Sequence, residues 1–169
     1  VIFPHYQIQI LAYNRAVRDL NGLDATRFLS KLNDVFDMVE NHNGECTAKN
    51  ELGLYLDGKW MRLVFKAENM ESETAADGLD VALLQHHVLG AILRSNDPRT
   101  SDRIDCIGGI RGVSELERLV DSGEYACAFS LFPTRIEDLM EIADANGLMP
   151  PKSTWFEPKL RDGMFCHMI

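Results

Sequence analysis

Hydrophobic and polar residues alternate in several short segments, which predicts β-strands. The clearest case is a β-hairpin over residues 52–65, where Asp57-Gly58 has the composition of a two-residue type I′ turn. Such a turn sets the cross-strand register and predicts three pairs: Leu52 with Leu63, Leu54 with Met61, and Tyr55 with Trp60. Further strands are predicted over residues 7–13, 104–107, 125–132 and 164–168.

Apolar residues spaced three or four apart predict helices between these strands. Asp24 is the expected N-cap of a helix whose apolar face runs from Phe28 to Val39, and a strongly apolar helix is predicted over residues 80–93. Two Ser/Thr-x-x-Glu patterns indicate capping boxes: Ser114 with Glu117, and Thr134 with Glu137. We expect the last of these helices to bury an apolar stripe of Ile136, Leu139, Met140 and Ala143. Residues 97–100 are typical of a turn.

The interleaving of strands and helices predicts an α+β or mixed α/β fold. We expect one mostly mixed sheet with about four helices packed on it, including the hairpin over residues 52–65. A length of 169 residues suits a single domain over residues 1–169. The chain begins at Val1 in a segment that already has a strand pattern, so we expect the natural N-terminus to lie further upstream.

Composition and charge narrow the function classes. Apolar residues make up 46% of the chain, which is enough for a hydrophobic core, and the net charge is −9. An acidic surface repels nucleic-acid phosphates and anionic membranes, so we expect neither as a partner. No apolar run approaches the roughly 18 residues of a membrane span, and no secretory signal is evident, which favours a cytoplasmic protein. A local basic pocket could still bind a small anion.

The cysteines and histidines do not predict a metal site. The cysteines form no CxxC pair, and we expect buried free thiols at Cys46, Cys106, Cys127 and Cys166. His86 and His87 are neighbours on a predicted helix, about 100° apart around its axis, so they are poorly placed to share one metal ion. We expect His86 to be exposed to solvent.

The stretch IDCIGGIRGVSELERL has the order strand, glycine loop, helix. Gly108 and Gly109 allow close approach of a ligand to the backbone, a helix N-terminus attracts anions, and Arg111 adds a bidentate donor. The stretch therefore contains a candidate anion site. A tight strand-to-helix turn with a surface arginine explains the same residues, and the spacing fits neither a dinucleotide-binding fingerprint nor a Walker loop.

The stretch GLMPPKSTWFEPKLRDGMF contains a second candidate site. Two prolines fix an extended backbone ahead of Lys152, Ser153 and Thr154, which gives these side chains a defined direction. Trp155 and Phe156 either cover a ligand or anchor the segment in the core, and a structural crossover pinned by Trp155 is the alternative interpretation.

Asn14 and Arg15 are further candidates, since they are expected to follow the first strand. They either line a site or belong to a local charge network.

Several stretches together resemble a widespread bacterial and archaeal family known as domain of unknown function family 1015. The motifs are QIQILAYNRAVRDLNG, GLYLDGKWMRL, LDVALLQ, DPRTSDRIDCIGGIRG, ELERLVDSGEYACAFSLFPT and LMPPKSTWFEPKLRDGMF. They cover nearly the whole chain, in the family's order. The resemblance implies that this chain is the C-terminal part of a longer protein. The family's N-terminal part carries an Asp-Gly-His-His-Arg motif similar to that of ParB-like and sulfiredoxin-like folds, which include free serine kinases; here His86-His87 precedes Val88, and the motif is absent.

The resemblance implies the C-terminal, ligand-wall domain of a small-molecule phosphotransferase acting on serine or phosphoserine. It favours one shared anion site built from Arg111, Lys152, Ser153 and Thr154. We expect no cofactor in this chain alone, and a nucleotide or pyrophosphate as a ligand of the longer protein. Whether this chain alone is an enzyme stays open. The alternative is a non-catalytic interaction or oligomerisation module that packs on the N-terminal half of the same protein or forms a homodimer.

Overall fold

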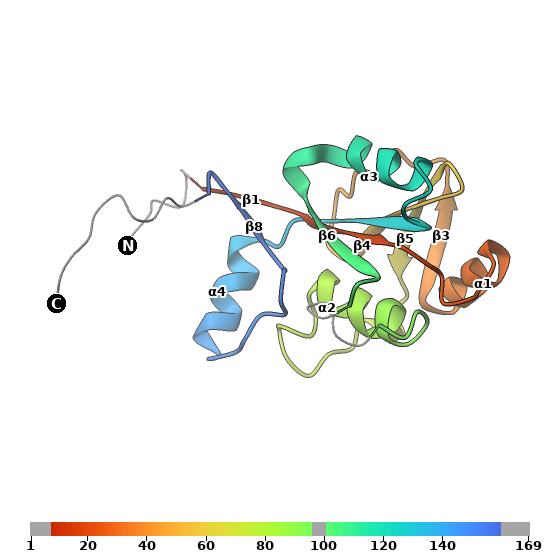
Figure 1. Cartoon of the computed structure of the whole chain (residues 1–169). Coiled ribbons are helices and arrows are strands. Elements are labelled where there is room, and N and C mark those ends of the chain that lie inside the picture. The colour runs from red at the N-terminus through yellow and green to blue at the C-terminus, as the bar shows by residue number, and fades with distance from the viewer. Residues whose placement is uncertain (1–7, 96–100, 160–169) are drawn as a thin grey trace.

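The computed structural model describes residues 8–95 and 101–159. A six-stranded sheet in the order β3-β5-β4-β7-β2-β6 has helices on both faces, and a two-stranded sheet of β1 and β8 lies at one end beside α4 (Figure 1). The α+β class is confirmed. Every strand pair in the described residues is antiparallel, and the strands form two sheets instead of the single mixed sheet expected.

The strands are β1 (Gln9–Leu11), β2 (Tyr13–Val17), β3 (Phe36–Glu40), β4 (Glu51–Leu56), β5 (Lys59–Phe65), β6 (Ile104–Gly108), β7 (Cys127–Leu131) and β8 (Trp155–Glu157). The α-helices are α1 (Ala25–Val35), α2 (Asp80–Leu84), α3 (Gly112–Asp121) and α4 (Ile136–Asp144). A π-helical segment, Gln85–Gly90, continues α2, and together they account for most of the helix predicted over residues 80–93. No helix in the described part of the chain is long and apolar enough to cross a membrane.

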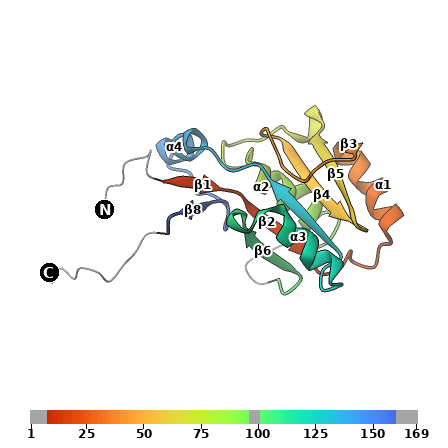
Figure 2. The ribbon, with the colours of Figure 1, turned by 90° about the horizontal axis from the view of Figure 1, so that it is seen from above.

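One strand path joins the two sheets. β1 pairs with β8 in the small sheet, and after the single residue Ala12 the chain continues as β2, which pairs with β6 and β7 in the large sheet. Figure 2 shows β1 running into β2, with α3 over the large sheet. The segment before β8 is thereby brought next to the start of β2.

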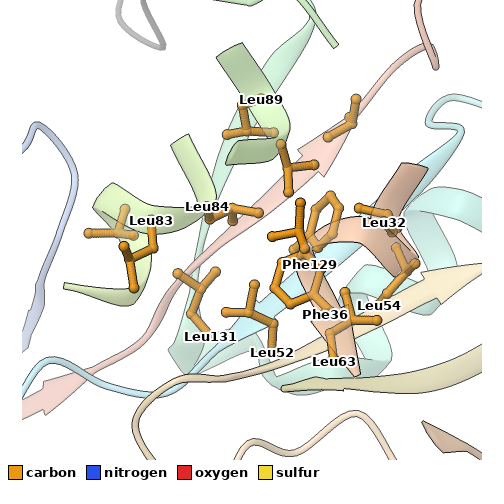
Figure 3. Close-up of a cluster of buried hydrophobic side chains, with 14 of the residues drawn as sticks. Leu32, Phe36, Leu52, Leu54, Leu63, Leu83, Leu84, Leu89, Phe129 and Leu131 are labelled. Carbon is orange, nitrogen blue, oxygen red and sulfur yellow. The ribbon is translucent and has the colours of Figure 1, made fainter. Parts of the chain in front are cut away.

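The main core fills the space between the large sheet, α1 and the helical segment over residues 80–90 (Figure 3). Strand alternation sends Leu52 and Leu54 of β4 into this core, while Tyr55 faces the opposite side and packs in a second cluster beneath α3. Fully burying each such leucine contributes roughly 1.5–3 kcal/mol, so the alternating pattern fixes which sheet face α1 and α2 cover.

The predicted hairpin is confirmed in detail. β4 and β5 pair in the predicted register: Leu52 with Leu63, Leu54 with Met61, and Tyr55 with Trp60. Asp57 and Gly58 have φ values of 49° and 74°, as a type I′ turn requires.

The expected length of α1 is wrong at its C-terminal end. Asp24 does cap the helix, because its carboxylate accepts a hydrogen bond from the Arg27 N–H. The helix ends at Val35, however, and Phe36 begins β3. Phe36 pairs with Phe65 of β5, with ring centroids 4.5 Å apart. Pairing with a strand distant in sequence therefore overrides the helical spacing.

Neither predicted capping box forms. α3 begins at Gly112, so Ser114 lies inside the helix, and Glu117 instead accepts a hydrogen bond from Trp60 Nε1 at 2.7 Å. α4 begins at Ile136, and its first turn is closed by the Arg135 N–H donating to Asp138. Thr134 donates to the carbonyl of Ser153 instead.

The apolar stripe predicted for α4 is also wrong. The helix buries Asp138 and Ile142, whereas Ile136 and Met140 are 39% and 57% exposed.

The thiols of the described cysteines differ in burial. Cys127 is fully buried, while Cys46 and Cys106 are only partly buried, which corrects the expectation of uniform burial. Burial raises the pKa of the Cys46 thiol to about 11. Cys166, the turn at residues 97–100 and the strand at residues 164–168 lie outside the described residues.

Candidate anion site

A pocket of about 440 Å³ lies where the start of β2 meets the segment leading into β8. It is lined by Met149, Pro150 and residues 152–156, together with Tyr13 and Lys159. We call it the lysine pocket, because among the described residues its lining contains two lysines and no carboxylate. On a chain of net charge −9 such a lining is a local exception, and it favours an anionic ligand.

Two aromatic rings and two ammonium groups form a continuous stack at this pocket. Tyr13 and Trp155 lie with ring centroids 5.5 Å apart and 28° between their planes. Lys152 Nζ lies 5.6 Å from the Tyr13 centroid, and Lys159 Nζ lies 4.2 Å from that of Trp155. Each such cation–π contact contributes about 0.5–1 kcal/mol at an exposed site, so the rings help to hold both ammonium groups at the pocket.

Gly108 and Gly109 explain why Trp155 lies here. Gly108 is opposite Tyr13 in the β2–β6 register, and a Cβ on Gly108 would lie 2.5 Å from the Trp155 ring. Gly109 donates its N–H to the Ala12 carbonyl at 2.8 Å, and a Cβ there would also lie 2.8 Å from that oxygen. The close approach that the glycines permit is therefore made by Trp155 and by the backbone at Ala12, and neither glycine lines the lysine pocket.

The Pro-Pro-Lys-Ser-Thr segment is held by its own hydrogen bonds. Ser153 is buried, and its hydroxyl donates to the Pro150 carbonyl at 2.5 Å, which closes a tight turn. Its own carbonyl accepts from Thr134 Oγ1 at 3.1 Å. Lys152 has a φ of 58°, in the left-handed region. Ser153 is therefore chiefly a structural part of the wall, while the Lys152 side chain is exposed at the pocket.

Asn14 and Arg15 lie within β2, and not after a strand as expected. The Arg15 side chain is 1% exposed, and its Nη2 donates to the Lys152 carbonyl at 2.9 Å. Its Nη1 donates to the Tyr13 carbonyl. Burial lowers the pKa of the Arg15 guanidinium. Asn14 Oδ1 accepts from the Leu131 N–H at 3.1 Å, which ties β2 to β7.

Arg111 is not part of the lysine pocket. Its side chain is exposed and forms an ion pair with Glu115, with Nη1 and Oε1 3.3 Å apart.

The structure thus brings Lys152, Ser153 and Thr154 together, with Arg15 behind them. Sequence reasoning missed the contributions of Tyr13 and Lys159. Lys159 follows Pro158 in the same stiff segment, which is the one local signal for it; Tyr13 has none.

A small cavity of about 10 Å³ lies behind the pocket and shares Tyr13 and Ser153 with it. Its lining includes Asp80, Asp138 and Lys49, and its size suits a single water molecule. Burial raises the pKa of Asp80 to about 6. Burial acts in the same direction on Asp138, but hydrogen bonds from Arg135 and Lys49 lower its pKa overall.

Comparison with solved structures shows a shared fold. A free serine kinase in complex with AMP matches with a TM-score of 0.51 and 14% identity, over 92% of this chain and 57% of the kinase chain. A conserved hypothetical protein from Pyrococcus furiosus matches with a TM-score of 0.55 and 14% identity, over 92% of this chain and 60% of the other. This chain therefore spans less than two thirds of the length of either protein. No curated protein matches it.

The family comparison concerns the first part of the chain. Residues 1–82 match the model described as "Protein of unknown function (DUF1015)". Over these residues the match confirms the resemblance that the motifs predicted.

Proposed function

We propose that this chain forms the ligand-binding wall of a small-molecule phosphotransferase of the serine or phosphoserine type. The observation that carries the proposal is the lysine pocket, which Lys152 and Lys159 line and to which no carboxylate among the described residues contributes. Phosphoryl transfer depends mainly on positioning and on neutralising negative charge, and these are the contributions that a cationic wall makes.

The pocket residues have distinct roles in this proposal. Lys152 and Lys159 neutralise phosphate charge, the Thr154 hydroxyl orients a phosphate oxygen, and Trp155 and Phe156 contact the apolar part of the ligand. A small phosphorylated or anionic molecule is the proposed ligand. Because the solved structures with this fold include kinases in complex with AMP and ADP, a nucleotide or pyrophosphate is a second proposed ligand of the longer protein. The transfer activity itself is proposed for that longer protein.

The test is calorimetric titration of the chain with phosphoserine and with pyrophosphate. Lys152→Ala removes the ammonium group but keeps the backbone carbonyl that Arg15 contacts, so we expect affinity to fall tenfold or more, about 1.4 kcal/mol. Lys31→Ala, on the exposed side of α1, is the matched control and should leave affinity unchanged. Equal affinities for the wild-type and Lys152→Ala chains would contradict the proposed role of this lysine.

One observation favours the alternative function of an interaction module. Ile136, Met140 and Leu148 are exposed apolar residues, and Leu148 is 90% exposed. Ile136 also lines an apolar hollow of about 450 Å³ beside β1 and Phe156. Exposed apolar surface of this kind is typical of a contact with another protein segment. The proposed occupant that can be tested on this chain alone is a second copy, which would form a homodimer.

Sedimentation velocity over a range of protein concentrations tests this alternative. If the surface joins two copies, the wild-type chain sediments as a dimer at high concentration and Met140→Ser shifts it toward monomer. Met70→Ser replaces a methionine packed against the main core and so controls for a general loss of stability. A chain that stays monomeric throughout would argue against self-association through α4.

A further inference from the structure

We propose that Arg15 is a positioning residue of the lysine pocket, which holds the backbone of Lys152 so that its ammonium group stays over Tyr13. The inference rests on the proposed function, since it concerns how the same anion site is kept in place. Arg15 itself does not line the pocket, and it acts through Lys152.

The first observation is the burial of the Arg15 charge. The side chain is 1% exposed, and among the described residues no carboxylate lies within ion-pairing distance of it. Its hydrogen-bond acceptors are backbone carbonyls of Tyr13, Asn14 and Lys152. A buried guanidinium with no carboxylate partner among the described residues is costly, so its presence calls for a role that a neutral side chain does not fill.

The second observation is the conformation of Lys152. Most described non-glycine residues with positive φ are Asn or Asp, whose short polar side chains tolerate this region; the exceptions are Arg94 and Lys152. A lysine with φ of 58° has an unfavourable backbone conformation, so surrounding contacts must stabilise it. The 2.9 Å hydrogen bond from Arg15 to the Lys152 carbonyl is such a contact, and it comes from a residue 137 positions away in sequence.

The third observation is that one guanidinium binds the backbone of both members of the Lys152–Tyr13 cation–π pair. Arg15 donates through different nitrogens to the carbonyls of Tyr13 and Lys152, and the Lys152 ammonium lies over the Tyr13 ring. A planar fork fixes the relative position of two acceptors, whereas the single ammonium of a lysine does not reproduce that geometry. Arg15 therefore sets the Lys152–Tyr13 geometry from behind the pocket wall.

A double-mutant cycle tests the inference, with pyrophosphate as the probe. Arg15→Lys keeps the charge and loses the fork, so we expect pyrophosphate affinity to fall more than about fivefold in the wild-type background. In the Lys152→Ala background the same change should alter affinity by less than about twofold, because the ammonium group that Arg15 positions is gone. Urea unfolding of all four proteins separates a loss of stability from a loss of binding.

The outcomes separate the two proposals. Equal affinity losses in both backgrounds, or lower stability without a change in affinity, would overturn the positioning role while leaving the anion site intact. A wild-type chain that binds neither pyrophosphate nor phosphoserine would overturn the proposed function, and the inference with it.

Should Arg15→Lys fail to fold, NMR of the arginine guanidinium protons in the wild-type chain provides the test. Pyrophosphate should slow exchange of the Arg15 protons with solvent, and should not do so in Lys152→Ala; unchanged exchange in the wild type would refute the role.

Discussion

Asp80 shows how strongly a single buried residue couples stability to pH. Burial raises its folded-state pKa to about 6, from 3.8, and outweighs the hydrogen bond from the Asn50 N–H and the attraction of Lys49. Because the folded chain holds this proton more tightly than the unfolded chain, Asp80 favours folding at low pH. That contribution is lost as the pH rises from about 4 through about 6.

Replacing Asp80 by Asn should therefore stabilise the chain at neutral pH. The amide keeps an oxygen for the Asn50 N–H and has no charge to desolvate, so we expect a gain of about 1–3 kcal/mol at pH 7.5 that shrinks at pH 5. Urea unfolding at both pH values measures it, with the exposed Asp144→Asn as the control. A gain of the same size at both pH values would mean that ionisation of Asp80 is not its cause.

At the scale of residues, local signals point to a segment of the chain, and its role as an anion site stays a prediction. Lys152, Ser153 and Thr154 were identified because two adjacent prolines stiffen the chain just before them, and the structure does bring them together. Tyr13 joins them from the other end of the chain through β-pairing, which no local pattern encodes. Arg111 has a local signal for anion binding, but its side chain pairs with Glu115 of its own helix.

At the scale of elements, two helices differ in whether the predicted capping residue does cap the helix. Asp24 accepts a hydrogen bond from the third residue after it, whereas Ser114, although it matches a capping pattern, lies inside α3. We expect Asp24→Ala to cost about 1 kcal/mol of stability and Ser114→Ala to change it by less than about 0.5 kcal/mol. Chemical unfolding of both variants measures the difference. A loss for Ser114→Ala as large as that for Asp24→Ala would show that this serine does cap the helix.

The hairpin and α1 show which element features can be predicted from the sequence. The hairpin register follows from two turn residues that lie between the paired strands, so it was predicted pair by pair. The end of α1 was missed because the helical spacing of apolar residues continues through Phe36, whereas Phe36 pairs with a strand about thirty residues later. Local chemistry thus predicts turns and helix starts better than it predicts where tertiary pairing interrupts a helix.

At the scale of the whole molecule, the class of fold could be predicted but the sheet arrangement could not. The sequence pattern predicts strands where β1, β4 and β7 lie, yet nothing in it states that β7 lies between β2 and β4. The lysine pocket depends on such long-range pairing, because Tyr13 pairs with Gly108 of β6 while β1 pairs with β8. The site could therefore be predicted only as a segment, and not as a pocket.

The pairing of β1 with β8 also determines how the domain would respond to tension. Gln9 lies opposite Glu157, so chain entering at β1 and leaving at β8 would pull on neighbouring points. In an antiparallel pair loaded in this way, the hydrogen bonds break one after another, as in a zipper, and not all at once as they do under shear. The small sheet should then be the first part to yield, and its opening would separate Tyr13 from Trp155 while the large sheet stayed folded. We therefore expect the lysine pocket to open first when the domain is pulled through β1 and β8.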